Sequence, residues 1–207
     1  MSLSSRRMVK LIDGRTGERN SVEAELYRDY PLTQLEVVEN QWANARAHAA
    51  AAAVDAGLTS MEHEDWDWRN KTDSVEAARH MLVAVECNGD VQGLMAVARD
   101  VRVSQLGNGQ VTYVDYLESA PWNLKATAAA PRFFGVGKVL IAEAVRLSLE
   151  AGLGGRVGLH SLAQAELFYI KCGMTRVGPD SSYFDLTFFE FTAQQATDLL
   201  VIIGETS

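Results

Sequence analysis

Residues able to bind an anion stand at the start of the strongest helical pattern in the chain. Arg132-x-x-Gly135-x-Gly137 is followed directly by Lys138, and apolar residues then recur at steps of three and four. Glycines let a ligand approach the backbone, and a helix start offers unpaired N–H groups and the positive end of the helix dipole. The segment therefore predicts an anion site, most often one for a phosphate or pyrophosphate. A tight turn that only allows close packing is the alternative for a Gly-x-Gly alone.

Two familiar phosphate-binding loops are excluded by single positions of this segment. A P-loop requires Ser or Thr after the lysine, where this chain has Val139. The dinucleotide-binding fingerprint requires a third glycine, and that position is Leu140. The anion site, if present, belongs to another class.

The helical pattern extends from the glycines to residue 151. An apolar face begins at Val136 and Leu140, and Glu143, Arg146 and Glu150 are predicted to form an opposite, polar face with charge pairs one turn apart. We expect this helix to lie with one face on a sheet.

A strand-like run and a second helix follow. Residues 156–162 predict the strand, and Phe168, Tyr169 and Cys172 share one face of a helix that Gly173 ends. Cys172 shares its face with apolar residues, which is typical of a buried cysteine and not of a nucleophile beside a base.

This order of motifs resembles the acetyl-CoA half of the GNAT acetyltransferase superfamily. Arg-x-x-Gly-x-Gly, a helix, a strand and then Ala-x-x-Phe-Tyr-x-x-x-Gly-Met carry the likeness, which covers about residues 111–191. It implies an α/β fold of the α+β type, with a mixed central sheet flanked by helices. It also implies one domain over residues 1–207: an N-terminal hairpin and helices at about 8–75, a cofactor-binding core at about 80–191 and an extension at 192–207.

The resemblance implies acetyl-CoA as cofactor and assigns residues to it. The pyrophosphate is expected on the glycine loop, and the backbone N–H around Leu117 is the expected oxyanion donor. Many relatives have an Asn that bonds the pantetheine where this chain has Leu162, so Ser161 is the candidate substitute. The expected loop contacts are Arg132, Phe133, Phe134, Gly135, Val136, Gly137 and Lys138.

Acetyl transfer to an amine needs a neutral amine, a stabilised carbonyl oxygen and a proton for the departing thiolate. By resemblance, Tyr169 holds the position of the acid that protonates the thiolate; a core tyrosine is the alternative. Glu118, at the end of the strand before the glycine loop, is the candidate base, and Asp115 is its nearest rival. His160 has an ordinary pKa suited to accepting a proton and ranks behind Glu118. An amine of low pKa would need no base.

The chain departs from the usual pattern through an insertion at residues 119–131, bounded by two prolines. Trp122 and Asn123 in this insertion could contact a substrate, because loops over a rigid site often set specificity. A surface excursion is the alternative.

The amino-acid composition limits the classes of molecule that the protein can bind. The chain has 207 residues, 47% of them hydrophobic, enough for one substantial core. A net charge of −8 argues against nucleic acid and suits a cationic or amine substrate. We expect a cytoplasmic protein with reduced thiols, since neither a signal peptide nor an apolar run of membrane-spanning length is present and Cys87 and Cys172 are the only cysteines.

The N-terminal part predicts a hairpin and a long helix. Residues 8–12 and 22–26 alternate around a glycine turn, and Thr33-x-x-Glu36 is a capping box before an apolar stripe. In the charged segment 61–71, Trp66 and Trp68 could line a pocket for a cationic amine, although rings that cover the core are the favoured interpretation. His63 lacks a second ligand at metal spacing, so no metal is expected.

Strands 81–86, 91–103 and 111–117 predict a three-stranded meander, with Asn88-Gly89 as its first turn. Near the C-terminus we expect a loop at 178–182, a strand at 183–191 and a helix capped by Thr192-x-x-Gln195. This last segment could cover a sheet edge or form a homodimer.

The sequence thus predicts an N-acetyltransferase that moves an acetyl group from acetyl-CoA to a primary amine by direct attack in a ternary complex. The acceptor is a small molecule or a peptide amine, with the acidic balance favouring a small cation. The alternative is a non-catalytic acyl-CoA-binding sensor or regulatory module of the same fold, which the absent Asn and the insertion support. A structural protein that kept the fold and lost the ligand is the third hypothesis.

Overall fold

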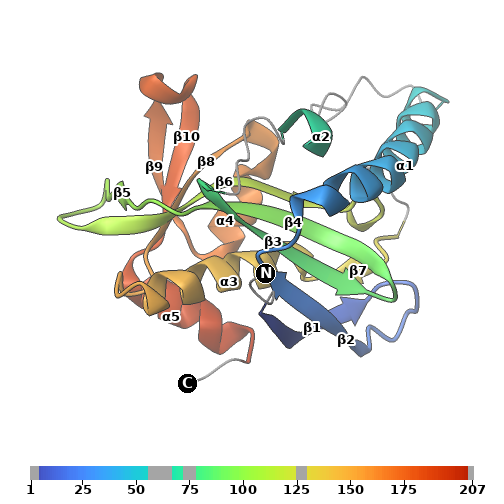
Figure 1. Ribbon diagram of the computed structural model, residues 1–207, viewed down its shortest axis with the longest axis horizontal. Coiled ribbons are helices and arrows are strands. Elements are labelled where there is room, and N and C mark those ends of the chain that lie inside the picture. The colour runs from blue at the N-terminus through green and yellow to red at the C-terminus, as the bar shows by residue number, and fades with distance from the viewer. Residues whose placement is uncertain (1–4, 56–66, 72–77, 125–129, 205–207) are drawn as a thin grey trace. The chain divides into compact units, whose positions relative to one another are not determined.

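The computed structural model describes residues 5–55, 67–71, 78–124 and 130–204 (Figure 1). The chain forms two compact units. Unit 1 comprises Met1–Leu94 and Glu118–Gly137, and unit 2 comprises Met95–Leu117 and Lys138–Ser207. Trp66, His63, the acidic residues 62–65 and the helical segment predicted at 73–76 lie outside the described residues.

The predicted α/β fold with a large mixed sheet flanked by helices is confirmed. The strands are β1 (Arg6–Asp13), β2 (Ser21–Arg28), β3 (His80–Cys87), β4 (Asp90–Ala98), β5 (Arg102–Val103), β6 (Gln110–Ser119), β7 (Phe133–Phe134), β8 (Val157–Ser161), β9 (Thr175–Asp180) and β10 (Leu186–Glu190). The helices are α1 (Leu35–Asp55), α2 (Trp68–Lys71), α3 (Val136–Glu150), α4 (Glu166–Cys172) and α5 (Ala193–Ile202). Figure 1 follows them from blue to red along the chain.

In unit 1 the strand order is β7-β1-β2-β3-β4. The predicted hairpin is confirmed: β1 and β2 pair antiparallel, and Val9, Leu11, Ala24 and Leu26 are buried on one face while their neighbours in sequence are more exposed. This alternation follows from the two-residue period of a strand. β2 continues the sheet by antiparallel pairing with β3.

Helix α1 buries Leu35, Val38 and Trp42, as the apolar stripe predicts. The indole N–H of Trp42 donates to the carbonyl of Val91 at 3.2 Å. The predicted capping box at Thr33 is wrong, because Thr33 lies inside a 3-10 turn, Leu32–Gln34, that precedes the helix.

The turn between β3 and β4 is confirmed, with Asn88 at φ 56° and Gly89 at φ 83°. Both values are positive, as a two-residue hairpin turn of the primed type requires. The single strand predicted at 91–103 is wrong, because a bend at Arg99 and Asp100 ends β4 and separates it from β5. Both bend residues are exposed.

In unit 2, β6 pairs parallel with β8, β8 antiparallel with β10, and β10 antiparallel with β9. The loop predicted at 178–182 is wrong over its first half, since β9 continues to Asp180. The strand predicted at 183–191 starts late, at Leu186, because Phe184 and Asp185 adopt positive φ angles of 55° and 58°.

Helix α3 is buried around most of its circumference, which corrects its predicted polar face. Glu143 is 0% exposed and lies 3.5 Å from Arg146 in an ion pair one turn away. The predicted charge pair between Glu143 and Arg146 is therefore present, but Glu143 is buried.

Two predicted helix ends in unit 2 are confirmed. Gly173 ends α4 in the left-handed conformation at φ 91°. Thr192 and Gln195 form the reciprocal capping box of α5. Within the part of the chain that the structure describes, no helix has the length and apolar character needed to span a membrane.

Candidate functional site

Glu118, the predicted base, is buried near the end of β6 and is 7% exposed. Arg46 Nη1 donates to Glu118 Oε1 at 2.9 Å, and Trp68 Nε1 donates to Oε2 at 2.7 Å. The two donors come from α1 and α2, so both helices of unit 1 hold this carboxyl group in one orientation. Trp68 is fully buried, in keeping with the favoured interpretation, and its indole also orients the candidate base.

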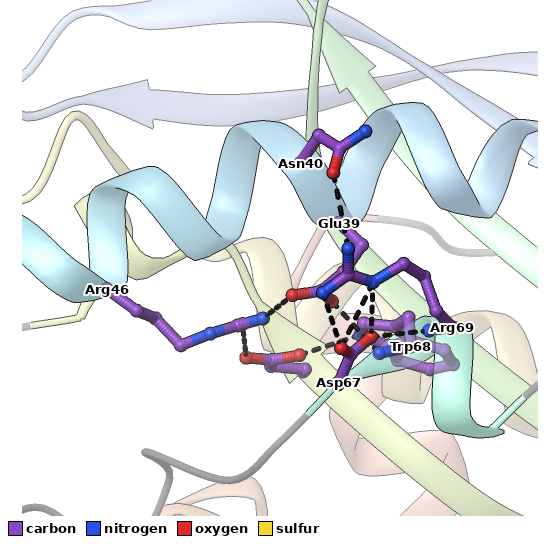
Figure 2. A network of polar contacts seen from close by, with 7 residues as sticks. Glu39, Asn40, Arg46, Asp67, Trp68 and Arg69 are labelled. Atoms are coloured by element: carbon purple, nitrogen blue, oxygen red, sulfur yellow. Dashed lines mark hydrogen bonds and ion pairs between the residues drawn. The ribbon is translucent and has the colours of Figure 1, made fainter.

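A second buried carboxylate shares the same donors. Glu39 is 1% exposed, forms an ion pair with Arg46 Nη2, and accepts the backbone N–H of Trp68 at 2.9 Å (Figure 2). We call Glu39, Arg46, Trp68 and Glu118 the Glu118 network.

Arg69 forms hydrogen bonds with two further polar residues next to this network. Its guanidinium bonds the Asp67 carboxylate at 2.6 to 3.0 Å and reaches Asn40 Oδ1 on α1 at 3.4 Å (Figure 2). These bonds link α2 to α1 and thereby fix the position of Trp68.

The network changes the chemistry of Glu118. Loss of water on burial raises the pKa of Glu118 to about 7, and the nearby Glu39 adds to this rise, while Arg46 and the Trp68 indole oppose it. A carboxyl group with a pKa near 7 exchanges its proton at neutral pH, which an unperturbed glutamate does not. This is the property a general base requires.

Sequence reasoning missed Glu39 and Arg46. Both lie on α1, seven residues apart and therefore on the same face, with the buried Trp42 between them. A charged pair within an apolar stripe was the available signal, because such side chains are rarely buried without partners.

The glycine loop is partly a strand. Phe133 and Phe134 form β7 and pair with Asp13 and Ile12 of β1. Gly135 follows at φ 92°, directly before α3, and a Cβ there would meet nothing within 4 Å. A side chain at this position would therefore point into open space, which leaves room for a ligand beside the loop.

Basic side chains surround this loop within unit 1. The half-exposed Arg132 lies 3.7 Å from Asp90 and 4.7 Å from the Trp122 ring. Arg15 and Arg19, which the sequence analysis did not select, place their guanidinium groups 4.9 and 5.3 Å from the rings of Phe133 and Phe134. Only the tertiary pairing of β1 with β7 brings these two arginines to the loop.

The described part of the insertion is anchored through Gln92 of β4. Trp122 Nε1 and Asn123 Nδ2 donate to Gln92 Oε1 at 2.9 and 3.0 Å, and Asn123 Oδ1 accepts the N–H of Phe133 at 2.9 Å. These bonds stabilise the approach to the glycine loop; the substrate role of Trp122 and Asn123 stays a prediction.

Tyr169, the predicted acid, lies in unit 2 on α4. It is 6% exposed, and its ring contacts Phe168 and Phe189 at centroid distances of 5.1 and 5.7 Å. Burial raises the pKa of the phenol well above its usual value, and raises the pKa of the Cys172 thiol to about 11. Both groups are therefore protonated at neutral pH. This fits Cys172 as an inert core thiol, while the raised pKa makes the Tyr169 phenol a weaker proton donor than an exposed tyrosine, and its role as the acid stays a prediction.

The predicted catalytic and cofactor-binding residues are distributed over both units. Glu118 and residues 132–137 belong to unit 1, and Leu117, Lys138, Ser161 and Tyr169 to unit 2. Ser161 is buried, and its hydroxyl donates to the carbonyl of Leu162 at 2.8 Å, which leaves oxygen lone pairs for a ligand donor.

The two rival bases belong to a separate cluster in unit 2. Asp115 lies 3.3 Å from Arg102, and His160 lies between Tyr113 and Asp180. Burial lowers the pKa of His160. No group of three or more side chains able to hold a metal ion occurs among the described residues.

Comparison with known proteins shows which solved structures share this fold. No family model matches the sequence, and no curated protein matches it. A protein from Desulfovibrio desulfuricans described as a GNAT-family acetyltransferase is similar in structure, with a TM-score of 0.52 and 13% identity over 82% of this chain and 99% of that one.

A GNAT-family acetyltransferase from Listeria monocytogenes is similar at a TM-score of 0.51 and 15% identity, over 88% of this chain and 98% of that one. At this identity the likeness concerns the fold. The chain has the fold of the GNAT acetyltransferases.

Proposed function

We propose that this protein is an acetyl-CoA-dependent N-acetyltransferase that acts on a primary amine by direct attack in a ternary complex. The fold supports the reaction class. The observation that carries the proposal is Glu118, a buried carboxyl group whose pKa is raised to about 7 and which two helices orient.

Acetyl-CoA would supply an activated thioester. Glu118 accepts a proton from the acceptor ammonium, because its pKa leaves a large fraction ionised at neutral pH. By resemblance, Tyr169 is the candidate that donates a proton to the departing thiolate, although burial raises the pKa of its phenol and so opposes release of that proton. The main-chain N–H at Leu117 donates to the carbonyl oxygen. No covalent acyl-enzyme is required, since the Cys172 thiol is buried with a pKa of about 11.

The phosphates are assigned to the glycine loop. Gly135 leaves its backbone open at the start of α3, and Arg132 and Lys138 flank it. Arg19 adds positive charge near Phe134, whereas the Arg15 guanidinium near Phe133 is paired with the Asp13 carboxylate at 2.7 Å. Backbone N–H groups at a helix start, together with basic side chains, match the needs of a pyrophosphate.

Calorimetric titration of the full chain with acetyl-CoA tests the proposal, with a desulfo analogue alongside. We expect micromolar binding of acetyl-CoA and, in an amine screen, release of free thiol. Absence of binding at millimolar cofactor would overturn the assignment.

Two matched glycine substitutions test where the phosphates of the cofactor bind. Gly135 and Gly89 both have positive φ angles, 92° and 83°, and open space at the Cβ position. Alanine therefore strains both backbones to a similar extent. We expect Gly135→Ala to weaken acetyl-CoA binding and Gly89→Ala to leave it unchanged; equal affinities would contradict our placement of the pyrophosphate.

The second candidate is a non-catalytic acyl-CoA sensor. The feature that favours it is the engagement of both Glu118 oxygens by Arg46 and Trp68, which would suit a purely structural carboxylate. Cofactor binding without thiol release for any amine would favour the sensor over the enzyme.

A further inference from the structure

A guanidinium group is enclosed by aromatic rings and a carboxylate in unit 2. The Cζ atom of Arg102 lies 3.6 Å from the Tyr113 ring centroid and 5.5 Å from that of Tyr183. Its Nη1 donates to the Tyr183 hydroxyl at 3.1 Å, and its Nη2 to Asp115 Oδ1 at 3.3 Å. We call Tyr113, Tyr183 and Asp115 the tyrosine cage.

The walls of the cage are fixed from behind. The Tyr113 hydroxyl lies 2.6 Å from His160 Nδ1, and His160 Nε2 lies 3.1 Å from Asp180 Oδ2. The Tyr183 ring stacks on the His160 ring at 4.1 Å with an interplanar angle of 5°. A chain of bonds from Asp180 through His160 thus holds both rings, independently of Arg102.

The occupant is held less firmly than the walls. Tyr113 is 1% exposed, whereas the Arg102 side chain is 35% exposed. Arg102 belongs to β5, a strand of two residues paired with Val111 and Gln110 of β6, and the adjacent Val103 is 77% exposed. Arg102 can therefore move without disturbing a long strand, although its side chain leaves two hydrogen bonds and two ring contacts behind.

The cage has the chemistry of a cation receptor. Ring faces attract cations through their quadrupole, and one carboxylate adds ionic attraction and directional acceptors. Asp115, at 13% exposure, places a negative charge beside the rings, which favours a cation in this position.

We propose that the tyrosine cage is a binding site for an organic cation with a guanidinium or primary ammonium head, and that Arg102 is an intramolecular occupant which this cation displaces. The assignment of that cation as the acceptor amine rests on the proposed function. The proposal that the tyrosine cage binds a cation does not depend on the proposed function.

Nuclear magnetic resonance titration of the tyrosine-labelled full chain, without acetyl-CoA, tests the cage. The probes are ethylguanidinium, propylammonium and the neutral isostere ethylurea. The variants are Arg102→Ala, Arg102→Gln as a second form if alanine disturbs folding, and Arg102→Ala combined with Asp115→Asn. Arg99→Ala is the charge-matched control, because Arg99 is an exposed arginine near β5.

We expect Arg102→Ala to bind the cations saturably and at least about tenfold more tightly than the wild type, since Arg102 occupies the site most of the time. The added Asp115→Asn change should reverse that gain, and Arg99→Ala should match the wild type. Ethylurea should not bind.

Folded Arg102 variants that bind the cations no better than the wild type, or that bind ethylurea equally well, would overturn the cage. Acetyl transfer measured separately by thiol release keeps the two proposals apart. Cation binding without transfer overturns the enzyme assignment alone, and transfer without a gain in binding overturns the cage alone.

Discussion

Each unit of the molecule encloses one arginine with carboxylates and an aromatic ring, but the two arrangements differ in burial. In the Glu118 network, Arg46 is 12% exposed and serves two carboxylates that are almost fully buried. Around the tyrosine cage, Arg102 is 35% exposed and Asp115 is 13% exposed. The Glu118 network thus contains more buried negative than positive charge, whereas Arg102 and Asp115 are both more exposed than the carboxylates of that network.

The two regions also differ in the pKa of their carboxyl groups. Burial raises the pKa of Glu118 to about 7, while hydrogen bonds from Ser182 and His160 lower the pKa of Asp180 to about 2. The chemical group is the same in both places. Loss of water and the number of donors, not residue type, therefore decide whether a carboxyl group can exchange a proton at neutral pH.

Removal of the two arginines should give the largest difference between the regions. Arg46→Ala leaves two buried carboxylates without their cation and should lower the free energy of unfolding by about 3 kcal/mol or more. Arg102→Ala, at a partly exposed site, should cost about 1 kcal/mol. Urea unfolding measures both, and equal losses would contradict the contrast in burial.

Two carboxylates on the same strand, β6, should affect turnover differently. Glu118→Gln should lower kcat by about 100-fold or more with acetyl-CoA affinity retained, because it removes the base. Asp115→Asn, which changes the separate cluster of unit 2, should leave kcat nearly unchanged. Steady-state kinetics with thiol detection separates these effects, and a full-rate Glu118→Gln variant would exclude Glu118 as the base.

The raised pKa of Glu118 predicts a pH dependence of stability. Because the folded pKa, about 7, exceeds the ordinary 4.5, the folded state binds more protons between these values. The free energy of unfolding should therefore fall as pH rises from about 5 to about 7, by roughly 2 to 3 kcal/mol, and then level off. Urea unfolding across this range should show the slope in the wild type. An identical slope in Glu118→Gln would assign it to other groups.

Asp180 should give the smallest effect and the opposite sign. Its pKa is lowered from 3.8 to about 2, so its contribution is present above pH 3.8 and is lost as pH falls through about 2. Asp180→Asn should therefore reduce stability slightly at neutral pH and flatten the acid limb of the unfolding curve. Circular dichroism during acid titration measures this limb; an unchanged limb would show that Asp180 has no such role.

Local patterns predicted the local structure well. The β1–β2 hairpin, the Asn88-Gly89 turn, the Gly173 helix end and the Thr192 cap each depend on residues within a few positions of one another. One local pattern failed, because Thr33 lies inside a 3-10 turn and does not cap α1. Other errors occurred where packing against distant residues decides. Glu143 was assigned to a polar face and is buried, and the loop expected at 178–182 is strand up to Asp180, because β9 pairs with β10 there.

In the candidate site, too, residues within local motifs were predicted and their distant partners were not. Its motif residues, among them Gly135, Tyr169 and Glu118, were selected from spacing and resemblance. The partners that set their chemistry were not: Arg46 and Trp68 lie 72 and 50 residues from Glu118 along the chain, and no short-range pattern links them. Arg15 reaches the glycine loop only through the pairing of β1 with β7.

The sequence by itself determined most of the strands and helices, the glycine loop and the residue types available for proton transfer, but it did not indicate the strands β7 and β9. Periodicity, caps and turns are short-range properties that the chain carries in any conformation. Tertiary structure alone decided which carboxyl group loses its water, which arginine pairs with it and which cation enters the tyrosine cage. Proton affinity depends on burial and on charges brought near in space, and neither exists until the chain has folded.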